Sequence, residues 1–349
     1  MIMRSIEQLD KNFEVKTKIE ETLHFTNCLE PPFRVYGLQS TEEGFVRMPP
    51  ETAQDVNPNV AALFRNTAGG RVRFRTNSPK IAIRAKMAGI GKMPHFPLTG
   101  SAGFDLYEDN IYRGTFIPPY DIENGYESMI HLYSKYEREI LIHFPLYSNV
   151  ISLEIGLCTG ASVLPPSPYS QELPVVYYGS SITQGGCASR PGNSYENILS
   201  RTLNIDHINL GFSGGAKGEK IMADYIAGLS MSAFVYDYDH NAPDTGHLRD
   251  THQNMFLKVR QAHPLLPVIM LSRPQPNPSD DDMLRRNIVM DTWQNALALG
   301  DKNIYFIDGS MMLHAFGGDS GTVDAIHPND LGFMCMAKFI QPVLQKALF

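Results

Sequence analysis

The chain has 349 residues, of which 43% are hydrophobic and 19% charged, and it carries a formal net charge of −7 at pH 7. This composition can fill folded cores and is unlike that of a disordered chain, and at roughly 100–200 residues per domain it predicts two domains. The acidic balance and the lack of a basic stripe argue against a nucleic-acid binder, and no run of about 18 apolar residues predicts a membrane-spanning helix.

The four cysteines, Cys28, Cys158, Cys187 and Cys335, are far apart and form no Cys-x-x-Cys pair. They match neither a zinc knuckle nor the dense disulfide framework of a small secreted domain. We therefore expect free thiols and no metal site. Residues 1–16 lack the apolar segment of a secretory signal, which predicts a cytoplasmic protein unless a leader was removed.

From about residue 30 to 160, apolar residues alternate with polar ones. Val72 and Phe74 alternate with Arg73 and Arg75, and the same period recurs at residues 81–87, 140–144 and 151–157, the last with Ile151, Leu153, Ile155 and Leu157 on one face. Alternation places one face of a strand in a core and the other in water, as in antiparallel sheets. Turns at residues 68–70 and 77–79 separate these runs. This half is predicted to be a β-sandwich or jelly roll.

A proline-rich segment separates the two halves. Residues 163–174, VLPPSPYSQELP, contain four prolines, and such a segment favours an extended conformation. The predicted organisation is a β-module over residues 1–165, a linker over 166–174 and a second domain over 175–349.

The second domain contains short apolar runs without alternation, at residues 175–178, 208–210, 233–236, 268–271 and 304–307. Segments compatible with helices lie between and after them, at about 193–203, 217–230, 248–263, 281–299 and 329–347. Strands buried on both faces lose polar alternation, and helical crossovers imply parallel strands. The prediction is a three-layer α/β domain with a five-stranded parallel sheet. Pro342 should kink or end the last helix.

Residues with catalytic potential follow four of the predicted strands, at the sheet edge where the sites of such domains gather. They lie in the segments Gly179–Thr183, Asn209–Gly214, Asp237–Asn241 and Asp324–Pro328. A serine hydroxyl becomes nucleophilic when a histidine removes its proton, and an acid orients that histidine. The spacing of Asp324 and His327 puts them on one face of a helical turn, from which both could approach Ser181.

An oxyanion requires preorganised donors, which the backbone of Ser181 and Gly214 and the side chain of Asn241 could supply. The sequence contains neither the phosphate loop GxxxxGK[ST] nor the nucleophile elbow GxSxG.

These segments resemble the four blocks of the SGNH, or GDSL, hydrolases, which contribute serine, glycine, asparagine and histidine in that order. The resemblance implies a flavodoxin-like three-layer fold, with Ser181 as nucleophile, Asp324 and His327 completing the triad, and Gly214 and Asn241 as oxyanion donors beside the Ser181 N–H. Two departures are that Ser180 replaces the usual aspartate of the first block and that the third block is Asp-Tyr-Asp-His-Asn instead of GxND.

Residues 103–107, Gly-Phe-Asp-Leu-Tyr, match the GxDLY signature of a module that precedes SGNH domains in some bacterial esterases. Several two-domain relatives of this type remove acetyl groups from sugars. The alternative interpretation of the motif is a strand with a buried tyrosine and an exposed acid.

The resemblance implies a serine esterase that hydrolyses short acyl esters, acetyl above all, on carbohydrates through an acyl-enzyme. It implies no metal or organic cofactor, and an acylated small molecule or oligosaccharide as partner, without nucleic acid or membrane. The alternatives are a thioesterase or lysophospholipase on the same fold, and a catalytically dead carbohydrate-binding protein.

Three further residues, Arg190, His240 and Trp293, have two interpretations each. Arg190 could bind a sugar hydroxyl or a carboxylate, or pair with an acid of the protein. His240 could line the pocket or form structural hydrogen bonds, and Trp293 could be a sugar platform or helix core. Cys187 is near the nucleophile in sequence, but nothing supports a cysteine-based mechanism.

Overall fold

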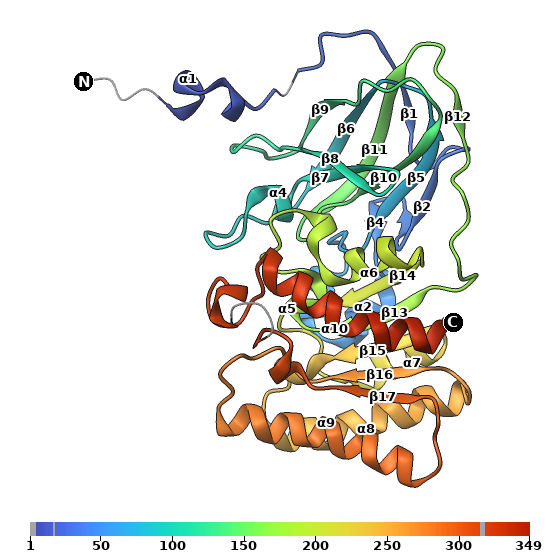
Figure 1. Ribbon diagram of the computed structural model, residues 1–349, viewed down its shortest axis with the longest axis vertical. Helices are drawn as coiled ribbons and strands as arrows, with labels where there is room; N and C mark the ends of the chain where they lie inside the picture. Colours follow the sequence, from blue (N-terminus) through green and yellow to red (C-terminus); the bar gives the residue numbers. More distant parts are fainter. Residues whose placement is uncertain (1–4, 17, 315–317) are drawn as a thin grey trace.

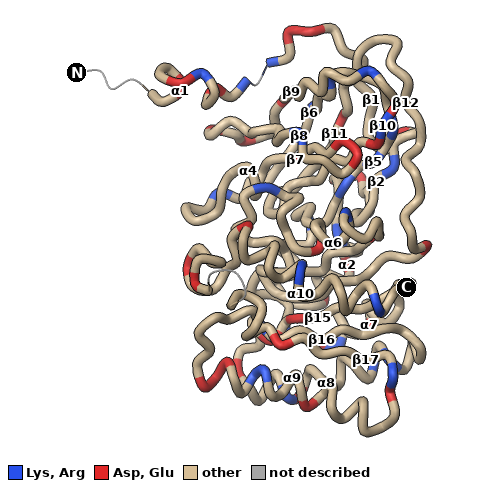
Figure 2. Tube along the Cα trace, viewed as in Figure 1, with Lys and Arg blue, Asp and Glu red and all other residues tan. Residues whose placement is uncertain are grey.

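A computed structural model describes residues 5–16, 18–314 and 318–349. It consists of a β-rich part and an α/β part that stack along the long axis of the molecule (Figure 1). Lysine and arginine are interspersed with aspartate and glutamate over both parts (Figure 2). None of the helices in the described ranges has the length and apolar character needed to cross a bilayer.

The β-rich part is a sandwich of two antiparallel sheets. One sheet has the strand order β1 (Leu23–Asn27), β11 (Asn149–Cys158), β6 (Lys80–Ala88) and β9 (Gly125–His131). The other has the order β12 (Val163–Leu164), β5 (Arg71–Thr76), β10 (Arg138–His143), β7 (Phe104–Glu108) and β8 (Ile111–Phe116), with β2 (Arg34–Tyr36) also paired to β5. The predicted sandwich is confirmed. A separate hairpin joins β3 (Gln39–Thr41) and β4 (Gly44–Val46), and the short helices are α1 (Ile6–Leu9), α2 (Pro50–Val56), α3 (Pro58–Leu63) and α4 (Leu98–Ser101).

The alternation expected along β11 is interrupted by a bulge. Its register shifts between Val150 and Ser152, so Val150 is buried and Ile151 is only half-buried. Leu153 and Ile155 then follow the alternation as expected. The prediction of Ile151 as a core residue was wrong because a bulge inserts one residue and reverses the facing of those before it.

Two of the three arginines of β5 do not face water, and the third, Arg75, is half-buried. Arg73 is buried and lies over the ring of Tyr169, 4.1 Å from its centroid. Arg71 is fully buried, donates to the Tyr169 hydroxyl over 3.0 Å and forms an ion pair with Asp206. The proline-rich linker is therefore packed across the outer face of β5, and the expectation that this face is solvated was wrong at Arg73, whereas Arg75 remains partly exposed.

The α/β part has a five-stranded parallel sheet in the order 2-1-3-4-5, as expected for a flavodoxin-like fold. Its strands are β14 (His207–Gly211), β13 (Val175–Gly179), β15 (Ala233–Asp237), β16 (Val268–Leu271) and β17 (Ile304–Ile307). One face packs on α5 (Ser181–Gln184), α6 (Tyr195–Leu203) and α10 (Asp330–Leu348), and the other on α7 (Lys220–Ala227), α8 (Thr245–Ala262) and α9 (Asp280–Ala298). Figure 1 shows α8 and α9 below the sheet.

Pro342 lies within α10, which continues past it to Leu348, so the proline does not end this helix. Short 3₁₀ helices occur at Lys11–Phe13, Pro191–Asn193, Tyr238–His240, Gly309–Met311 and Gly318–Gly321.

The β4–α3 segment belongs to the first half of the chain but packs in the core of the α/β part. Val46, Met48, Val60 and Phe64 are buried there together with α7 and the sheet. The core of the second domain is thus completed by residues that lie before the predicted linker.

Candidate active site

The turn after β13 presents Ser181 at the start of a short helix. Ser180 is the N-cap of α5, and its hydroxyl accepts a hydrogen bond from the Ile182 N–H over 3.1 Å. Serine and aspartate are both favourable N-cap residues, so Ser180 can fill a capping position that an aspartate would also suit. Ser181 follows as the first helical residue and is 6% exposed.

Ser181, His327 and Asp324 form one hydrogen-bonded line. The Ser181 Oγ lies 3.0 Å from Nε2 of His327, and Nδ1 of the same ring lies 2.8 Å from Oδ2 of Asp324. These distances allow His327 to exchange a proton with Ser181 while Asp324 fixes the ring orientation.

Asp324 and His327 lie in a closed loop and not on a helical turn, so that part of the prediction was wrong. The Asp324 Oδ1 accepts from the backbone N–H groups of Ile326 over 3.1 Å and His327 over 2.7 Å. The Val323 N–H donates to the His327 carbonyl over 3.0 Å, and Ala325 has φ +67°. Aspartate side chains favour such turns because they bond the backbone that follows them, and α10 begins only at Asp330.

The loop also sets the charge state of Asp324. Partial burial alone would raise the pKa of this carboxyl, but the hydrogen bonds from the His327 backbone and ring outweigh burial and lower it. Asp324 is therefore held as a carboxylate, the form that can stabilise an imidazolium.

Two backbone donors near the nucleophile are free. Among the described residues, the N–H groups of Ser181 and Gly214 have no acceptor. Asn241 donates one amide hydrogen to the Phe212 carbonyl over 2.9 Å, which ties it to the loop of Gly214 and leaves its second hydrogen available. All three predicted oxyanion donors thus retain an N–H that could bind an anion.

The loop that carries Gly214 is held by the first half of the chain, which sequence reasoning missed. Asn59 donates to the Gly214 carbonyl over 3.0 Å and Asn57 to the Gly215 carbonyl over 2.8 Å. Buried Arg47 donates to the carbonyl at the end of β14. No sequence motif marks these residues, because their role depends on where α2 and α3 dock.

The GxDLY motif joins the two parts of the molecule. Asp105 is fully buried and accepts from Arg190 over 3.0 Å and from the Gly192 N–H over 2.8 Å. Arg190 also bonds the Tyr107 hydroxyl and lies over the Tyr112 ring, 3.8 Å from its centroid. The alternative interpretation of the motif was right about a buried tyrosine, Tyr107, and wrong about an exposed acid. Arg190 pairs with this acid, so the structure favours that interpretation over a sugar contact.

His240 lies near enough to His327 for the two rings to interact electrostatically. Burial, helped by the nearby Arg273 and His327, lowers the pKa of His240 to about 3. Its Nδ1 is buried without a hydrogen-bond partner in the described part of the chain. His240 is therefore neutral at physiological pH, and no structural hydrogen bond at Nδ1 accounts for it.

Trp293 lies in α9 and packs near Phe306, as expected of a helix residue near the core.

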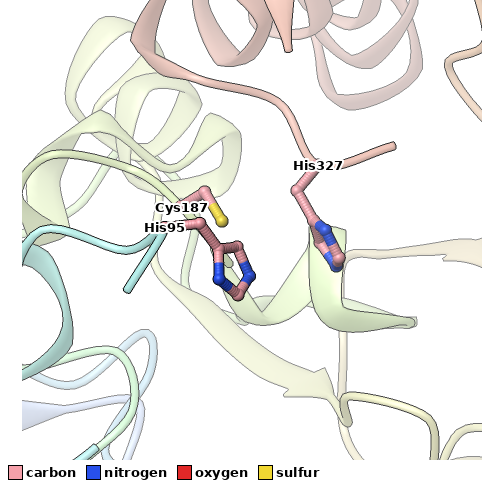
Figure 3. A group of neighbouring side chains, drawn as sticks. All are labelled: His95, Cys187 and His327. Carbon is pink, nitrogen blue, oxygen red and sulfur yellow. The ribbon is translucent and has the colours of Figure 1, made fainter. Parts of the chain in front are cut away.

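Two more groups approach His327. The His95 ring, from the loop between β6 and α4, has its centroid 6.1 Å from that of His327. The Cys187 thiol lies beside them (Figure 3). Burial and the charge of Asp324 raise the pKa of Cys187 to about 12, which makes it a poor nucleophile. Nothing in the sequence around His95 could have predicted this position, because it depends on how the β-rich part packs against the α/β part.

Comparisons with known proteins identify the family and the fold. The model of the GDSL-like lipase/acylhydrolase family matches residues 172–345. The model of the GxDLY module, described as the N-terminus of an SGNH-hydrolase-type esterase, matches residues 23–163. A search of curated proteins gives no significant match.

Solved structures share the two-domain architecture. A protein from Bacteroides ovatus described as a GDSL-like lipase is 31% identical with a TM-score of 0.83, and the match covers 94% of this chain and 98% of that one. The salicylyl-acyltransferase SsfX3 of a tetracycline biosynthetic pathway is 20% identical over 94% and 99% of the two chains, with a TM-score of 0.78. A family two carbohydrate esterase from Clostridium thermocellum, solved with cellohexaose, is 17% identical over 81% and 94%, with a TM-score of 0.59. The likenesses to SsfX3 and to the carbohydrate esterase show a shared fold alone.

Proposed function

The chain belongs to the GDSL-like lipase/acylhydrolase family, and from this premise we propose that it is a serine esterase that removes short acyl groups, acetyl above all, from carbohydrates. The observation that carries the proposal is the line of hydrogen bonds from Ser181 through His327 to Asp324, 3.0 and 2.8 Å long. A fold can host many functions, so the proposal rests on these groups and not on the architecture alone.

In the proposed reaction, the Ser181 Oγ attacks the ester carbonyl while Nε2 of His327 takes its proton. Asp324 stabilises the imidazolium that forms. The tetrahedral intermediate then collapses, the bond to the leaving alcohol breaks, and His327 returns the proton to that alcohol. Water deprotonated by His327 attacks the acyl-enzyme, the acid leaves, and Ser181 recovers its proton.

The negative charge of each intermediate would lie against the N–H groups of Ser181 and Gly214 and the side-chain amide of Asn241. Their backbone donors are unoccupied in the described structure. Preorganised donors of this kind stabilise the transition state more than the ground state, and removing one typically costs about 10²–10³-fold in kcat.

The carbohydrate part of the proposal is supported by the GxDLY–SGNH arrangement and by the likeness to a two-domain carbohydrate esterase. A thioesterase or lysophospholipase remains the second candidate of the same reaction class. It differs in the expected acyl preference, because such enzymes need room for a longer acyl chain.

The test is hydrolysis of nitrophenyl acetate, butyrate and octanoate by the wild type, Ser181→Ala and the matched control Ser180→Ala. Ser181→Ala should lose at least about 10³-fold in kcat, since the nucleophile is absent. Ser180→Ala should retain most of the activity and lose about 1 kcal/mol of stability as a helix cap. Equal activity of Ser181→Ala and wild type would reject Ser181.

The acyl series tests the substrate class separately. A preference for acetate followed by release of acetate from acetylated xylan, mannan or sialic acid, detected by mass spectrometry, would support a carbohydrate acetylesterase. A preference for octanoate would favour the thioesterase or lysophospholipase. No turnover of any ester by the folded wild type would favour a binding protein with a dead hydrolase domain.

A further inference from the structure

Three side chains with metal-binding atoms meet at the candidate active site. His95 comes from the β-rich part, Cys187 from the loop after α5, and His327 from the loop before α10. One ligand atom of each lies within 4.8 Å of the others (Figure 3). The three segments are far apart in the sequence, so the cluster exists only in the folded two-part molecule.

We propose that His95, Cys187 and His327 bind one divalent transition-metal ion of the Zn²⁺ type, and that its binding reversibly switches the enzyme off. Imidazole nitrogen and thiolate sulfur suit Zn²⁺ and its neighbours in the first transition row, whereas Mg²⁺ and Ca²⁺ prefer oxygen. The donor set therefore selects this class of ion.

The required adjustment is small. Bond lengths of about 2.1 Å to nitrogen and 2.3 Å to sulfur place the ligands of a tetrahedral zinc ion about 3.3–3.8 Å apart. The three donor atoms, within 4.8 Å of one another, must therefore approach by about 1 Å. His95 is exposed and can rotate toward the buried Cys187 thiol. Coordination replaces the thiol proton, which leaves to solvent as the sulfur–metal bond forms.

The environment of His327 already suits a metal ligand. Its Nδ1 is bonded to Asp324 over 2.8 Å, which fixes the ring and leaves Nε2 as the nitrogen that faces the site. A carboxylate on the far nitrogen of a ligating histidine orients the ring and increases its basicity in many zinc sites. The hydrogen bond to Asp324 that would orient His327 as a general base would therefore also orient it as a metal ligand.

Gly186, the residue before Cys187, lies beside this ring. A Cβ added at Gly186 would lie 3.6 Å from Cδ2 of His327 and 3.0 Å from the Ser181 carbonyl oxygen. The backbone before Cys187 can thus pass close to His327, and Cys187 itself adopts φ +76°, which is uncommon for a residue with a side chain.

The consequence for activity rests on the proposed function. Nε2 of His327 lies 3.0 Å from the Ser181 Oγ. A metal ion on Nε2 would occupy the electron pair that must accept the serine proton, so attack on the ester would stop until the ion leaves.

The site itself is tested without turnover, by titrating the full chain with Co²⁺ and recording the thiolate-to-cobalt charge-transfer absorption. The wild type should bind one ion with this band. Cys187→Ser should lose the band, and His95→Gln should weaken binding at least about tenfold. The controls Cys158→Ser and His131→Gln alter a thiol and a histidine outside the cluster and should behave as the wild type. A wild type without the band, or a band that survives in Cys187→Ser, would overturn the proposal.

The switch is tested with Zn²⁺ and nitrophenyl acetate, each rate being divided by the metal-free rate of the same variant. Zn²⁺ should inhibit the wild type, a chelator should restore activity, and the inhibition constant should rise at least about tenfold in Cys187→Ser. Cobalt binding without ester turnover would reject the proposed function but retain the site. Turnover without cobalt binding would reject the site alone.

Discussion

At the scale of single residues, the buried carboxyl of Asp237, at the end of β15, has a strongly raised pKa. It accepts hydrogen bonds from the hydroxyls of Thr183 and Tyr195. A Cβ at Gly179 would overlap this carboxyl, so only glycine fits there. The pKa of Asp237 is raised to about 8, because burial, helped by the charge of Asp239, outweighs the hydrogen bond from Thr183.

The first prediction concerns Asp237→Asn and the pH dependence of stability. The native protein keeps a proton on Asp237 that the unfolded chain releases near pH 4. The stability from this proton is complete below about pH 4 and is lost as pH rises toward about 8. In Asp237→Asn, the unfolding free energy from urea titrations should therefore fall less steeply between pH 5 and 8 than in the wild type. The exposed control Asp280→Asn should keep the wild-type slope, and an unchanged slope in Asp237→Asn would contradict the assignment.

The sequence predicts some single residues of this site better than others. The choice of Ser181 and His327 follows from the order of the blocks and from the rule that parallel strands end at one edge of a sheet. In the structure, the Ser181 Oγ lies 3.0 Å from Nε2 of His327. His95 and Asn59 lie in loops or helices without a motif, and their place depends on how two parts dock. No local pattern encodes that docking.

At the scale of elements, the α2–α3 segment supports the loop of the proposed oxyanion donors. Asn57 accepts from the N–H groups of Asn59 and Val60 and so caps α3, while its amide donates to Gly215. Asn59 is the second residue of this capped helix and donates to the Gly214 carbonyl over 3.0 Å. A peptide group held at its carbonyl also has a fixed N–H direction at the next residue, because the group is planar. The helix thus restrains the loop around Gly214.

Asn59→Ala should consequently impair turnover more than binding. Asn59 acts through the loop, and losing a hydrogen bond worth about 0.5–1.5 kcal/mol should lower kcat about two- to tenfold with little change in KM. Steady-state kinetics with nitrophenyl acetate measure both constants. Asn303→Ala is the matched control, because Asn303 also donates its amide to a backbone carbonyl, that of Leu265, over 2.9 Å. An effect on KM alone, or an equal effect of Asn303→Ala, would contradict a positioning role.

The elements themselves are well predicted from the sequence, because buried parallel strands lose their polar alternation and helices fill the intervals between them. All five predicted strands of the sheet lie within a residue of β13 to β17. The partner of an amphipathic helix is not encoded in this way: α2 and α3 could equally have covered the sandwich. Arg73 was misplaced for the same reason, since only the docked linker removes its face from water.

At the scale of the whole molecule, the two parts share their cores. One core of the α/β part includes residues from before the linker, namely Val46, Met48, Val56, Val60 and Phe64. The other includes Phe96, Leu146 and Tyr147 from the β-rich part. Each large apolar side chain contributes about 1.5–3 kcal/mol when buried, so the group is comparable with the total stability of a domain, about 5–15 kcal/mol.

The hydrolase half should therefore not fold by itself. A fragment of residues 175–349 would expose the surfaces that these side chains cover, and Arg190 would lose its buried partner Asp105. We expect this fragment to aggregate or to melt without a cooperative transition in calorimetry, whereas the full chain should unfold in one transition. A control that starts at Glu20 removes α1, which has no buried residue, and should melt like the full chain. A soluble 175–349 fragment with its own cooperative transition would contradict a shared core and would mean that the sandwich is an independent attachment.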